Sequence, residues 1–347
     1  MHIEELKIDG YEKVVRCEDP ATGLKAIIAV HNTNLGPAVG GTRLFPYASE
    51  DAALTDVLRL SRGMTYKSSL AGINFGGGKS VIIADPKDKS PEMLKAFGRF
   101  VNTLGGLYIC AEDVNTSPSD MEIVYTETRH VAGLNKDGGD PSPFTALGVV
   151  ESIKATAAKL DLPMSELSVA IQGVGHVGWY MTVMLREMGT TVYITDLRTD
   201  LVDELAAKTG AIAIKPDEIM TWECDILAPC AMGATLNDET IPALKCKAVV
   251  GCANNQLADL KHAKMLHERG ILYGPDYLVN AGGIINVFYE RKPEGYVESA
   301  SKQACRDIAK TLTNIFEMSE RKSMTTAEAA DRIAEQRFLA HRVQMVG

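Results

Sequence analysis

Short apolar runs and amphipathic segments alternate along the first part of the chain, a pattern that predicts a mixture of strands and helices. The runs at 24–31 and 80–84 are rich in β-branched residues, so we expect strands there. The segment 49–62 opens with a serine that can cap a helix, followed by acidic residues and by apolar residues at helical spacing. We expect this helix to end at Gly63 and a second helix to cover 91–104.

The second part of the chain shows a more regular alternation. Strands are predicted at 167–172, 191–195, 212–214, 226–228, 248–252 and 272–274, with helical patterns between several of them. Such alternation is typical of βαβ units and a parallel sheet. The two parts meet at 138–143, a segment rich in glycine and proline that predicts a break between domains.

Composition and charge narrow the class of protein. The 347 residues carry 36 basic and 45 acidic side chains, a net charge of −9, so no overall positive field attracts nucleic acids or anionic membranes. No apolar run approaches the ~20 residues of a membrane span, and the first residues do not resemble a signal peptide. The seven scattered cysteines include no CxxC pair. We therefore expect a cytoplasmic protein with no metal, nucleic-acid or membrane partner.

The predicted strand at 167–172 runs into GVGHVG, a glycine-rich sequence typical of dinucleotide-binding proteins. A helical pattern follows, and the next strand ends at Asp196. The separation of Gly178 and Asp196, 196 − 178 = 18 residues, is close to the ~20 expected for this motif. The motif consists of Gly173, Val174, Gly175, His176, Val177 and Gly178.

Each part of this motif has a physical task. Gly173 allows a tight turn, Gly175 leaves space for a pyrophosphate, and Gly178 lets the helix pack closely. The helix N-terminus offers unpaired N–H groups to the phosphates. Asp196 can bind the ribose hydroxyls and would repel a 2′-phosphate, so NAD is favoured over NADP. Arg198 lies nearby, however, and an arginine can accommodate such a phosphate.

Two lysines of the first part stand beside glycines, where a ligand can approach the backbone closely. We interpret Lys67 as lying at a helix end, Lys79 at the exit of a glycine-rich turn, and 36–41 as a second such turn. Near a nicotinamide, one lysine can bind a carboxylate. Its charge, together with burial, lowers the pKa of the other lysine toward the range of a general base. The alternative is that both are ordinary surface lysines.

A phosphate-binding loop of an NTPase is a second interpretation of the glycines before Lys79. That motif requires glycine at position 73, which is isoleucine here, and it leads into a helix. The apolar run after Ser80 predicts a strand instead. Spacing and order therefore both argue against an NTPase.

Several segments taken together resemble the amino acid dehydrogenase family, most closely its leucine-specific members. They occur in order over nearly the whole chain, which is more specific than the glycine motif alone. The segments are GPAVGGTR (36–43), GMTYK (63–67), GGGK (76–79), AEDV (111–114), APCA (228–231), NNQL (254–257) and PDYLVNAGG (275–283).

The resemblance implies an α/β fold of two domains with a cleft between them. Residues 1–140 would form a substrate and catalytic domain, and residues 141–327 a Rossmann-type dinucleotide-binding domain. The C-terminal helices, 328–347, are expected to return to the first domain. The implied reaction is the reversible, NAD-dependent oxidative deamination of an L-amino acid to a 2-oxo acid and ammonium.

The resemblance also implies site residues, position by position. Lys79 matches the lysine that activates the attacking water, and Asp113 matches the acid that exchanges a proton with the substrate nitrogen. Lys67, together with Gly40 and Gly41, matches the site of the substrate carboxylate. Beyond the glycine motif and Asp196, the expected cofactor contacts are Thr145, Ala228, Pro229, Cys230 and Asn255.

The positions expected around the substrate side chain are all apolar, which suits an aliphatic or aromatic side chain and disfavours glutamate: Val39, Met64, Ala111, Ile284 and Val287. One methylene is worth only ~1–3 kcal/mol of discrimination, so leucine, valine and isoleucine would all react.

Two alternatives to the branched-chain reaction remain open. One is an aromatic substrate, phenylalanine or tryptophan. Asn115 replaces the usual glycine of the leucine enzymes, and the glycine motif reads GHVGW where they read GNVA. The other is a non-catalytic NAD-binding module. The family resemblance further implies a homo-oligomer, often an octamer.

Overall fold

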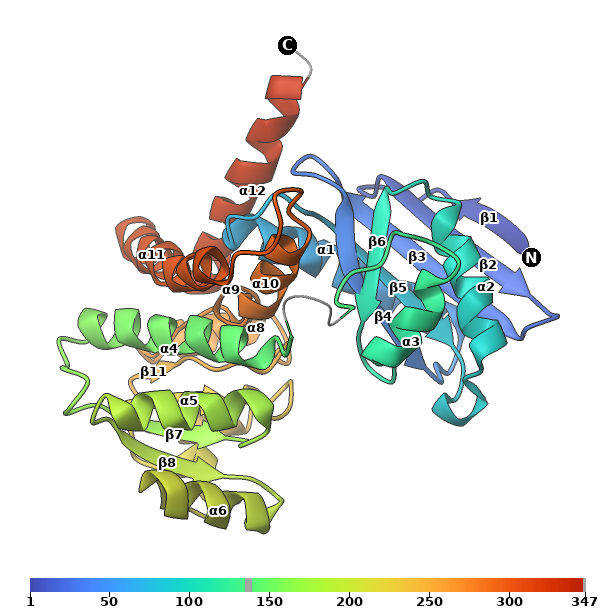
Figure 1. The fold of residues 1–347 in the computed structure, drawn as a ribbon. Helices are drawn as coiled ribbons and strands as arrows, with labels where there is room; N and C mark the ends of the chain where they lie inside the picture. The colour runs from blue at the N-terminus through green and yellow to red at the C-terminus, as the bar shows by residue number, and fades with distance from the viewer. Residues whose placement is uncertain (135–138, 346–347) are drawn as a thin grey trace. The chain divides into compact units, whose positions relative to one another are not determined.

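The computed structural model of the chain describes residues 1–134 and 139–345, with side chains up to residue 340. The chain forms two compact units (Figure 1). Unit 1 comprises Met1–Gly139, Glu290–Tyr296 and Ala334–Gly347, and unit 2 comprises Asp140–Tyr289 and Val297–Ile333. The change of unit at 139/140 falls in the glycine- and proline-rich segment, of which residue 138 lies outside the described residues. Each unit contains a sheet and helices, so the predicted α/β class is confirmed.

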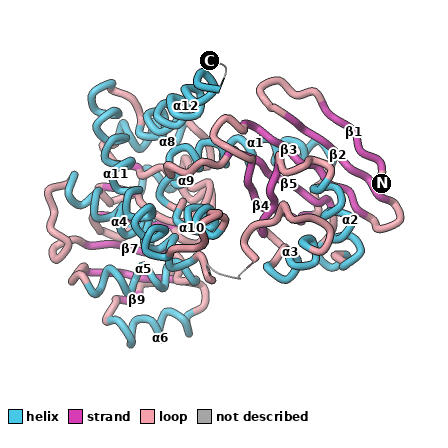
Figure 2. Tube along the Cα trace, turned by 45° about the horizontal axis from the view of Figure 1, so that its top comes forward, coloured by secondary structure: helices cyan, strands magenta, loops and turns pink. Residues whose placement is uncertain are grey.

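Unit 1 is built on a six-stranded mixed sheet. Its strands, in spatial order, are β1 (His2–Leu6), β2 (Lys13–Asp19), β3 (Leu24–Asn32), β5 (Gly76–Ile83), β4 (Ala38–Phe45) and β6 (Tyr108–Glu112). Neighbours pair antiparallel from β1 to β5, whereas β5, β4 and β6 run parallel. Helix α1 (Glu50–Leu70) covers one face, and α2 (Pro91–Asn102) covers the other, side by side with α3 (Pro118–Tyr125) (Figure 2).

The alternation of side chains along β3 explains these layers. Ile27 and Ala29 point to one face and pack with Val57 of α1. Ile28 and Val30 point to the other face and pack with Phe97 of α2. The strand is therefore apolar at almost every position, as expected for a strand buried on both faces.

The prediction that the first helix ends at Gly63 is wrong, because α1 continues to Leu70. Glycine costs only ~1 kcal/mol in a helix interior. Beyond it, Thr65, Tyr66 and Leu70 are buried, and this packing outweighs the local preference. Lys67 consequently lies in the last turn of a long helix.

The predicted glycine-rich turns at 36–41 and 72–80 are also wrong from Ala38 and from Gly76 onward, where strands begin. Gly40 and Gly41 lie inside β4, and Gly76–Gly78 open β5. The reason is that neighbouring elements leave no room for a Cβ at these positions. A Cβ at Gly77 would lie 2.6 Å from the Ser61 carbonyl oxygen of α1, and one at Gly78 would lie 2.6 Å from the Tyr108 ring.

Unit 2 is built on a parallel sheet, and the six predicted strands are confirmed. Their spatial order is β12 (Leu272–Tyr273), β11 (Ala248–Val249), β10 (Ile226–Pro229), β7 (Ser168–Gln172), β8 (Thr191–Thr195) and β9 (Ile212–Ala213). Counted from β7, this is the 3-2-1-4-5-6 order of doubly wound dinucleotide-binding folds. Such sheets bind ligands where the order reverses, at the carboxyl ends of β7 and β10.

Helices surround this sheet. In Figure 1, α4 (Ser142–Lys159) and α5 (His176–Glu187) lie side by side, and α11 (Glu298–Lys322) packs against α4. The remaining helices are α6 (Thr199–Thr209), α7 (Thr240–Ala243), α8 (Lys261–Glu268), α9 (Asp276–Val279), α10 (Gly282–Glu290) and α12 (Thr326–Met345). Two short 3₁₀ segments occur at Pro86–Asp88 and Ile219–Thr221.

Helix α12 belongs to unit 2 up to residue 333 and to unit 1 from residue 334. Its Arg337 donates hydrogen bonds to the carbonyl oxygens of Ser69 and Ile73, at 3.1 and 3.0 Å. A cation at the last carbonyls of a helix satisfies unpaired acceptors and complements the helix dipole. Arg337 therefore stabilises the end of α1, the turn that carries Lys67.

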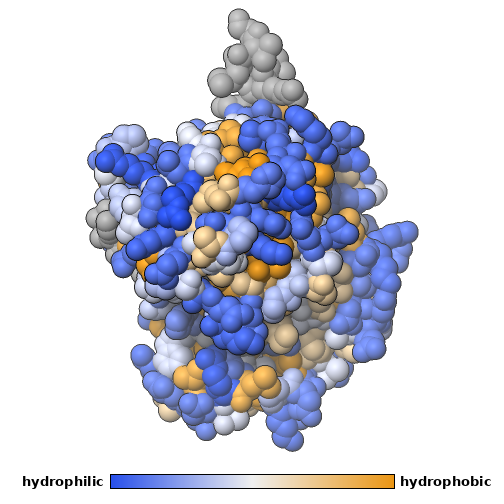
Figure 3. Space-filling view, turned by 90° about the vertical axis from the view of Figure 1, so that its right-hand side faces the viewer, coloured by the Kyte–Doolittle hydropathy of each residue, from blue (hydrophilic) through white to orange (hydrophobic). Residues whose placement is uncertain are grey.

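No helix within the described residues is long and apolar enough to cross a bilayer. On the face drawn in Figure 3, hydrophilic residues predominate and apolar residues appear in separate patches.

Candidate active site

The structure brings Lys79 and Asp113 together in unit 1. Lys79 lies in the middle of β5 and is only 6% exposed. Asp113 follows directly after β6, and its Oδ2 lies 3.0 Å from Lys79 Nζ. Because β5, β4 and β6 are neighbours in that order, Gly41 of β4 and Ala111 of β6 lie on the same sheet face as Lys79.

Gly41 allows this pair to lie close against β4. A Cβ at this position would lie 2.7 Å from Asp113 Cβ and 3.2 Å from Lys79 Nζ. Gly40 faces the opposite side of the sheet, where its carbonyl oxygen accepts a hydrogen bond of 2.6 Å from Tyr108. Val39 shares the face of Gly41 but is fully buried.

Arg43 is the residue that the sequence reasoning missed. Its Nε donates to Asp113 Oδ2 at 3.0 Å, and its Nη1 donates to Asp56 Oδ2 at 2.9 Å. Tyr47 donates its hydroxyl to the same Asp56 oxygen at 2.6 Å. Asp113 thus lies between two cations, Lys79 and Arg43. Arg43 is itself held in place by its ion pair with Asp56.

Burial and the neighbouring charges have opposing effects on the pKa of Lys79 and on that of Asp113. Burial lowers the pKa of Lys79, and the Asp113 carboxylate only partly opposes this effect. Burial also raises the pKa of Asp113, but the charges of Lys79 and Arg43 outweigh it and hold the pKa below its usual value. Asp113 therefore stays ionised, and Lys79 releases its proton more readily than a surface lysine.

Lys67 and Met64 lie on α1. They are three residues apart, so they share a helix face, and both are half-buried. Because Gly77 has no side chain, α1 lies directly on β5. The helix that carries Lys67 therefore covers the sheet face that carries Lys79.

The glycine motif of unit 2 forms a tight turn after β7. Gly173 has a φ of +100°, which favours glycine, and its N–H donates to Thr195 O at 2.8 Å. A Cβ at Gly178 would collide with the Gly173 carbonyl oxygen, so this glycine lets α5 start close to the turn. A Cβ at Gly175 would meet nothing closer than Arg198 Nη2 at 3.7 Å. The start of α5 is therefore open, and His176 beside it is exposed.

Asp196 lies at the end of β8 and is tied to this turn. Its Oδ2 accepts from the Val174 N–H at 3.0 Å and from Arg198 Nη2 at 3.1 Å. Hydrogen bonds from Arg198 lower the pKa of Asp196 to about 2. Asp196 also lines a pocket of about 390 Å³ together with Val202 and Trp222.

The other expected cofactor residues lie on three segments of unit 2. Ala228 and Pro229 end β10, and the N–H of Cys230 donates to Gln172 O at 2.7 Å, which places them beside the glycine turn. Asn255 has a left-handed backbone, with a φ of 52°. Thr145 lies in the first turn of α4.

Asn255 and Thr145 each have defined local contacts. Asn255 donates its N–H to Asp276 Oδ2 at 2.6 Å. A Cβ at Gly283, at the start of α10, would lie 3.2 Å from Thr145 Oγ1. On α10, Ile284 and Val287 are half-buried and share a helix face.

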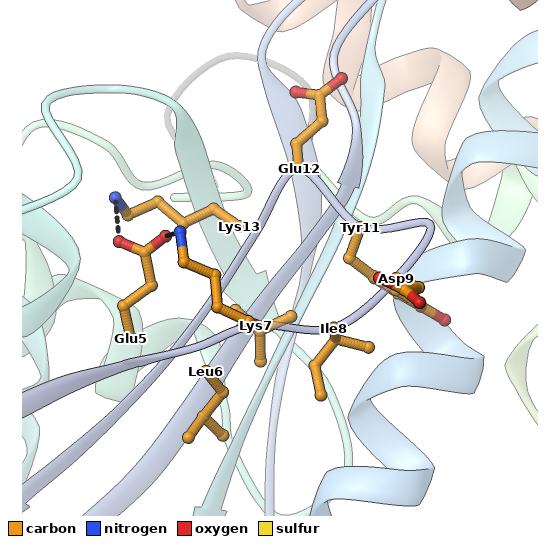
Figure 4. Close-up of a pocket in the computed structure, with 9 residues that line it drawn as sticks. Glu5, Leu6, Lys7, Ile8, Asp9, Tyr11, Glu12 and Lys13 are labelled. Carbon is orange, nitrogen blue, oxygen red and sulfur yellow. Dashed lines mark hydrogen bonds and ion pairs between the residues drawn. The ribbon is translucent and has the colours of Figure 1, made fainter.

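A separate pocket of about 160 Å³ lies around the β1–β2 connection (Figure 4). There Glu5 bonds both Lys7, at 3.4 Å, and Lys13, at 3.1 Å. None of the predicted site residues lines it. In the part of the chain that the structure describes, no group of three or more His, Cys, Asp or Glu side chains is placed to hold a metal ion.

Family models match both parts of the chain. The dimerisation domain of Glu/Leu/Phe/Val dehydrogenases matches residues 11–130, and the Glutamate/Leucine/Phenylalanine/Valine dehydrogenase domain matches residues 193–344. The leucine dehydrogenase of Bacillus cereus is 48% identical over 342 residues, covering 96% of this chain and 93% of the relative. The L-tryptophan dehydrogenase of Nostoc punctiforme is 44% identical over 338 residues, covering 96% and 95%.

Solved structures agree with these matches. The structure of L-tryptophan dehydrogenase from Nostoc punctiforme superposes with a TM-score of 0.87 at 42% identity, covering 96% of this chain and 97% of that one. Glutamate dehydrogenase from Thermus thermophilus, at 22% identity and a TM-score of 0.79, covers 96% and 90% and shares the fold.

The strand order and glycine turn of unit 2 are those of a Rossmann-type dehydrogenase, and the matches specify which kind. The chain belongs to the Glu/Leu/Phe/Val dehydrogenase family and is an amino acid dehydrogenase. Members of this family generally use a nicotinamide cofactor.

Proposed function

We propose that the protein catalyses the reversible, NAD-dependent oxidative deamination of a branched-chain L-amino acid to its 2-oxo acid and ammonium. Leucine would be the main substrate, with valine and isoleucine as further ones. The observation that carries this proposal is the buried Lys79, whose Nζ lies 3.0 Å from Asp113 Oδ2. The 48% identity to a leucine dehydrogenase supports the branched-chain substrate.

In this mechanism Lys79 is the general base. A nicotinamide held by unit 2 would supply the hydride acceptor that converts the amino acid into an imino acid. Neutral Lys79 then takes a proton from the water that attacks the imino carbon, and burial favours that neutral form. Asp113 exchanges a proton with the substrate nitrogen, while Arg43 fixes its position.

Lys67 holds the substrate carboxylate in this proposal. A lysine acts as a point charge that needs no fixed plane, and the last turn of α1 is fixed by Arg337. Gly41 lets Asp113 and Lys79 lie close against β4, and Gly40 lets β4 pack closely on β5. The side-chain pocket draws on the apolar residues expected from the sequence: Val39, Met64, Ala111, Ile284 and Val287.

The residues of unit 2 fit a dinucleotide. The open position at Gly175 and the N-terminus of α5 suit a pyrophosphate, and Asp196 suits the ribose hydroxyls of NAD. Unit 2 would thus be the dinucleotide-binding domain, and unit 1 the catalytic domain, completed by the end of α12. We also infer a cytoplasmic homo-oligomer, octameric by family resemblance, which agrees with the dimerisation-domain match over 11–130.

NADH oxidation with a panel of 2-oxo acids tests the proposal. We expect turnover only when ammonium and an oxo acid are both present, and fastest with 4-methyl-2-oxopentanoate. Strong turnover with phenylpyruvate or indolepyruvate and none with 4-methyl-2-oxopentanoate would refute the branched-chain substrate. That aromatic alternative is favoured by Asn115 and by the 44% identity to a tryptophan dehydrogenase. NADH binding without any turnover would indicate a non-catalytic module.

Replacing Asp196 by alanine is expected to weaken NAD binding much more than NADP binding. A hydrogen bond to a charged group contributes about 1.5–3 kcal/mol, so NAD affinity should fall roughly ten- to a hundredfold. NADP loses less because the repulsion of its 2′-phosphate disappears and Arg198 is released. Fluorescence titration with both reduced cofactors measures the difference.

Asp203→Ala is the matched control, since Asp203 lines the same pocket as Asp196. It should leave both affinities near the wild-type values. Equal losses for the two cofactors in the Asp196 variant would contradict the ribose assignment.

A further inference from the structure

Two of the seven cysteines differ from the rest. Cys230 and Cys252 are partly exposed, and the other five are buried: Cys17, Cys110, Cys224, Cys246 and Cys305. Cys230 follows β10 and Cys252 follows β11, two neighbouring parallel strands. Both therefore lie at the carboxyl edge of the sheet of unit 2, where such folds bind their ligands.

The backbone around these cysteines is in direct contact. The N–H of Ala253 donates to Pro229 O at 2.9 Å. On the other side of Cys252, a Cβ at Gly251 would lie 2.8 Å from Pro229 Cδ. Cys252 Sγ itself lies 3.8 Å from the carbonyl oxygen of Cys230. The two cysteines are thus held against each other by the segments that carry them.

Their thiols also interact with each other and with a third sulfur. The hydrogen bond with the Cys230 thiol, together with burial, raises the pKa of Cys252 well above its usual value. Cys230 Sγ lies 3.7 Å from the sulfur of Met181, a side chain with no exposed surface. Cys230 is therefore placed between a thioether and a thiol that stays protonated.

We propose that Cys230 and Cys252 form a redox-sensitive dithiol, which a low-molecular-weight disulfide converts into an intramolecular disulfide that weakens dinucleotide binding. The first part rests on the positions of the two cysteines. The second part rests on the proposed cofactor site.

The exchange proceeds in two balanced steps. The Cys230 thiolate attacks one sulfur of the small disulfide, forms a mixed disulfide and releases one thiolate. Cys252 then loses its proton and attacks Cys230 Sγ, which expels the second small thiolate. The two cysteines lose two electrons and two protons, and the small disulfide becomes two thiols.

The new bond would act on the glycine turn through Cys230. Its N–H binds Gln172 O at 2.7 Å, directly before Gly173. The next residue, Ala231, packs so closely on Gly173 that a Cβ there would lie 2.7 Å from Ala231 Cβ. A disulfide draws its sulfurs to about 2.05 Å. Moving Cys230 toward Cys252 therefore displaces the support of the turn.

Treatment of the reduced full-length protein with oxidised glutathione tests this proposal. We expect the intact mass to fall by two hydrogens with no glutathione attached, and peptide mapping to link Cys230 to Cys252. NADH affinity should fall about tenfold or more, and dithiothreitol should restore it. Bound NADH should slow the reaction.

Variants separate the outcomes. Cys252→Ser, or Cys252→Ala if the serine variant folds poorly, should instead retain one glutathione on Cys230. Cys246→Ala, which removes one of the buried cysteines, should form the bond as the wild type does.

A wild type that keeps glutathione without a cross-link would overturn the dithiol. A cross-link with unchanged NADH affinity would overturn the effect on binding. A reduced protein that binds no NADH would refute the proposed cofactor site, while the mass still decides the dithiol.

Discussion

Replacing Lys79 by alanine is expected to abolish turnover while leaving NADH affinity near normal. A general base contributes roughly 10²–10⁴-fold to the rate, so kcat should fall by at least that range. NADH binding should survive because every residue expected to contact the cofactor lies in unit 2, whereas Lys79 lies in unit 1. Stopped-flow or steady-state assays measure kcat, and a fluorescence titration measures the affinity for NADH.

Lys79→Arg is the informative control. Arginine keeps the positive charge beside Asp113 but does not release its proton in proteins. We expect it to be as inactive as alanine if Lys79 acts as a base. Substantial activity in this variant would mean that the charge alone matters. A parallel loss of NADH binding would mean that Lys79 belongs to the cofactor site.

The same assignment predicts the pH dependence of the wild type. Lys79 must be neutral to act as a base, so deamination should rise with pH through the pKa of this lysine. Burial lowers that pKa, and the rise should therefore be complete at a lower pH than for an ordinary lysine of pKa about 10.4.

Gly77→Ala is expected to destabilise unit 1 more than most single substitutions. The new methyl group would collide with the backbone N–H of Thr65 and approach the Ser61 carbonyl oxygen to 2.6 Å. These are atoms of α1, and a helix cannot turn aside as a flexible side chain can. Overpacking can lower the free energy of unfolding by about 3 kcal/mol. For a domain of this size, that loss corresponds to a decrease in Tm of roughly 6–12 °C. Thermal unfolding followed by circular dichroism measures it.

Gly63→Ala tests the same helix in the opposite direction. Gly63 lies inside α1 with nothing within 4 Å of a new Cβ. Alanine should stabilise the helix by about 1 kcal/mol, or roughly 2–4 °C. An unchanged Tm for Gly77→Ala would show that α1 does not pack on β5 as closely as the structure describes.

The contrast between these two glycines explains where sequence reasoning succeeds. The strands and turn of unit 2 follow a local order, strand then glycines then helix then Asp196, and all of it was predictable. In unit 1 the glycine-rich segments predict turns, because the sequence alone does not reveal that neighbouring elements leave no room for a Cβ. Positions 77 and 78 require glycine because residues on other elements, Thr65 and Tyr108, leave no room for a Cβ.

The predicted turn at 36–41 also conceals the role of Arg43. Val39, Gly41 and Arg43 are spaced two apart, which on a strand places them on one face. The prediction of a turn at 36–41 conceals this periodicity, and with it the position of Arg43 beside Asp113. Arg337 had no local signal at all, since its partners, Ser69 on α1 and Ile73 just after it, are 268 and 264 residues away in the sequence.

The interleaving of the two units along the chain has a consequence for dissecting the protein. The polypeptide changes unit four times, after Gly139, Tyr289, Tyr296 and Ile333. Dividing the chain after residue 139 therefore does not yield two fragments that each contain one complete unit. The N-terminal fragment would lack Arg337 at the end of α1, and the C-terminal fragment would carry exposed pieces of the other unit. Fusion, circular permutation or exchange of either unit between relatives would have to preserve all four crossings.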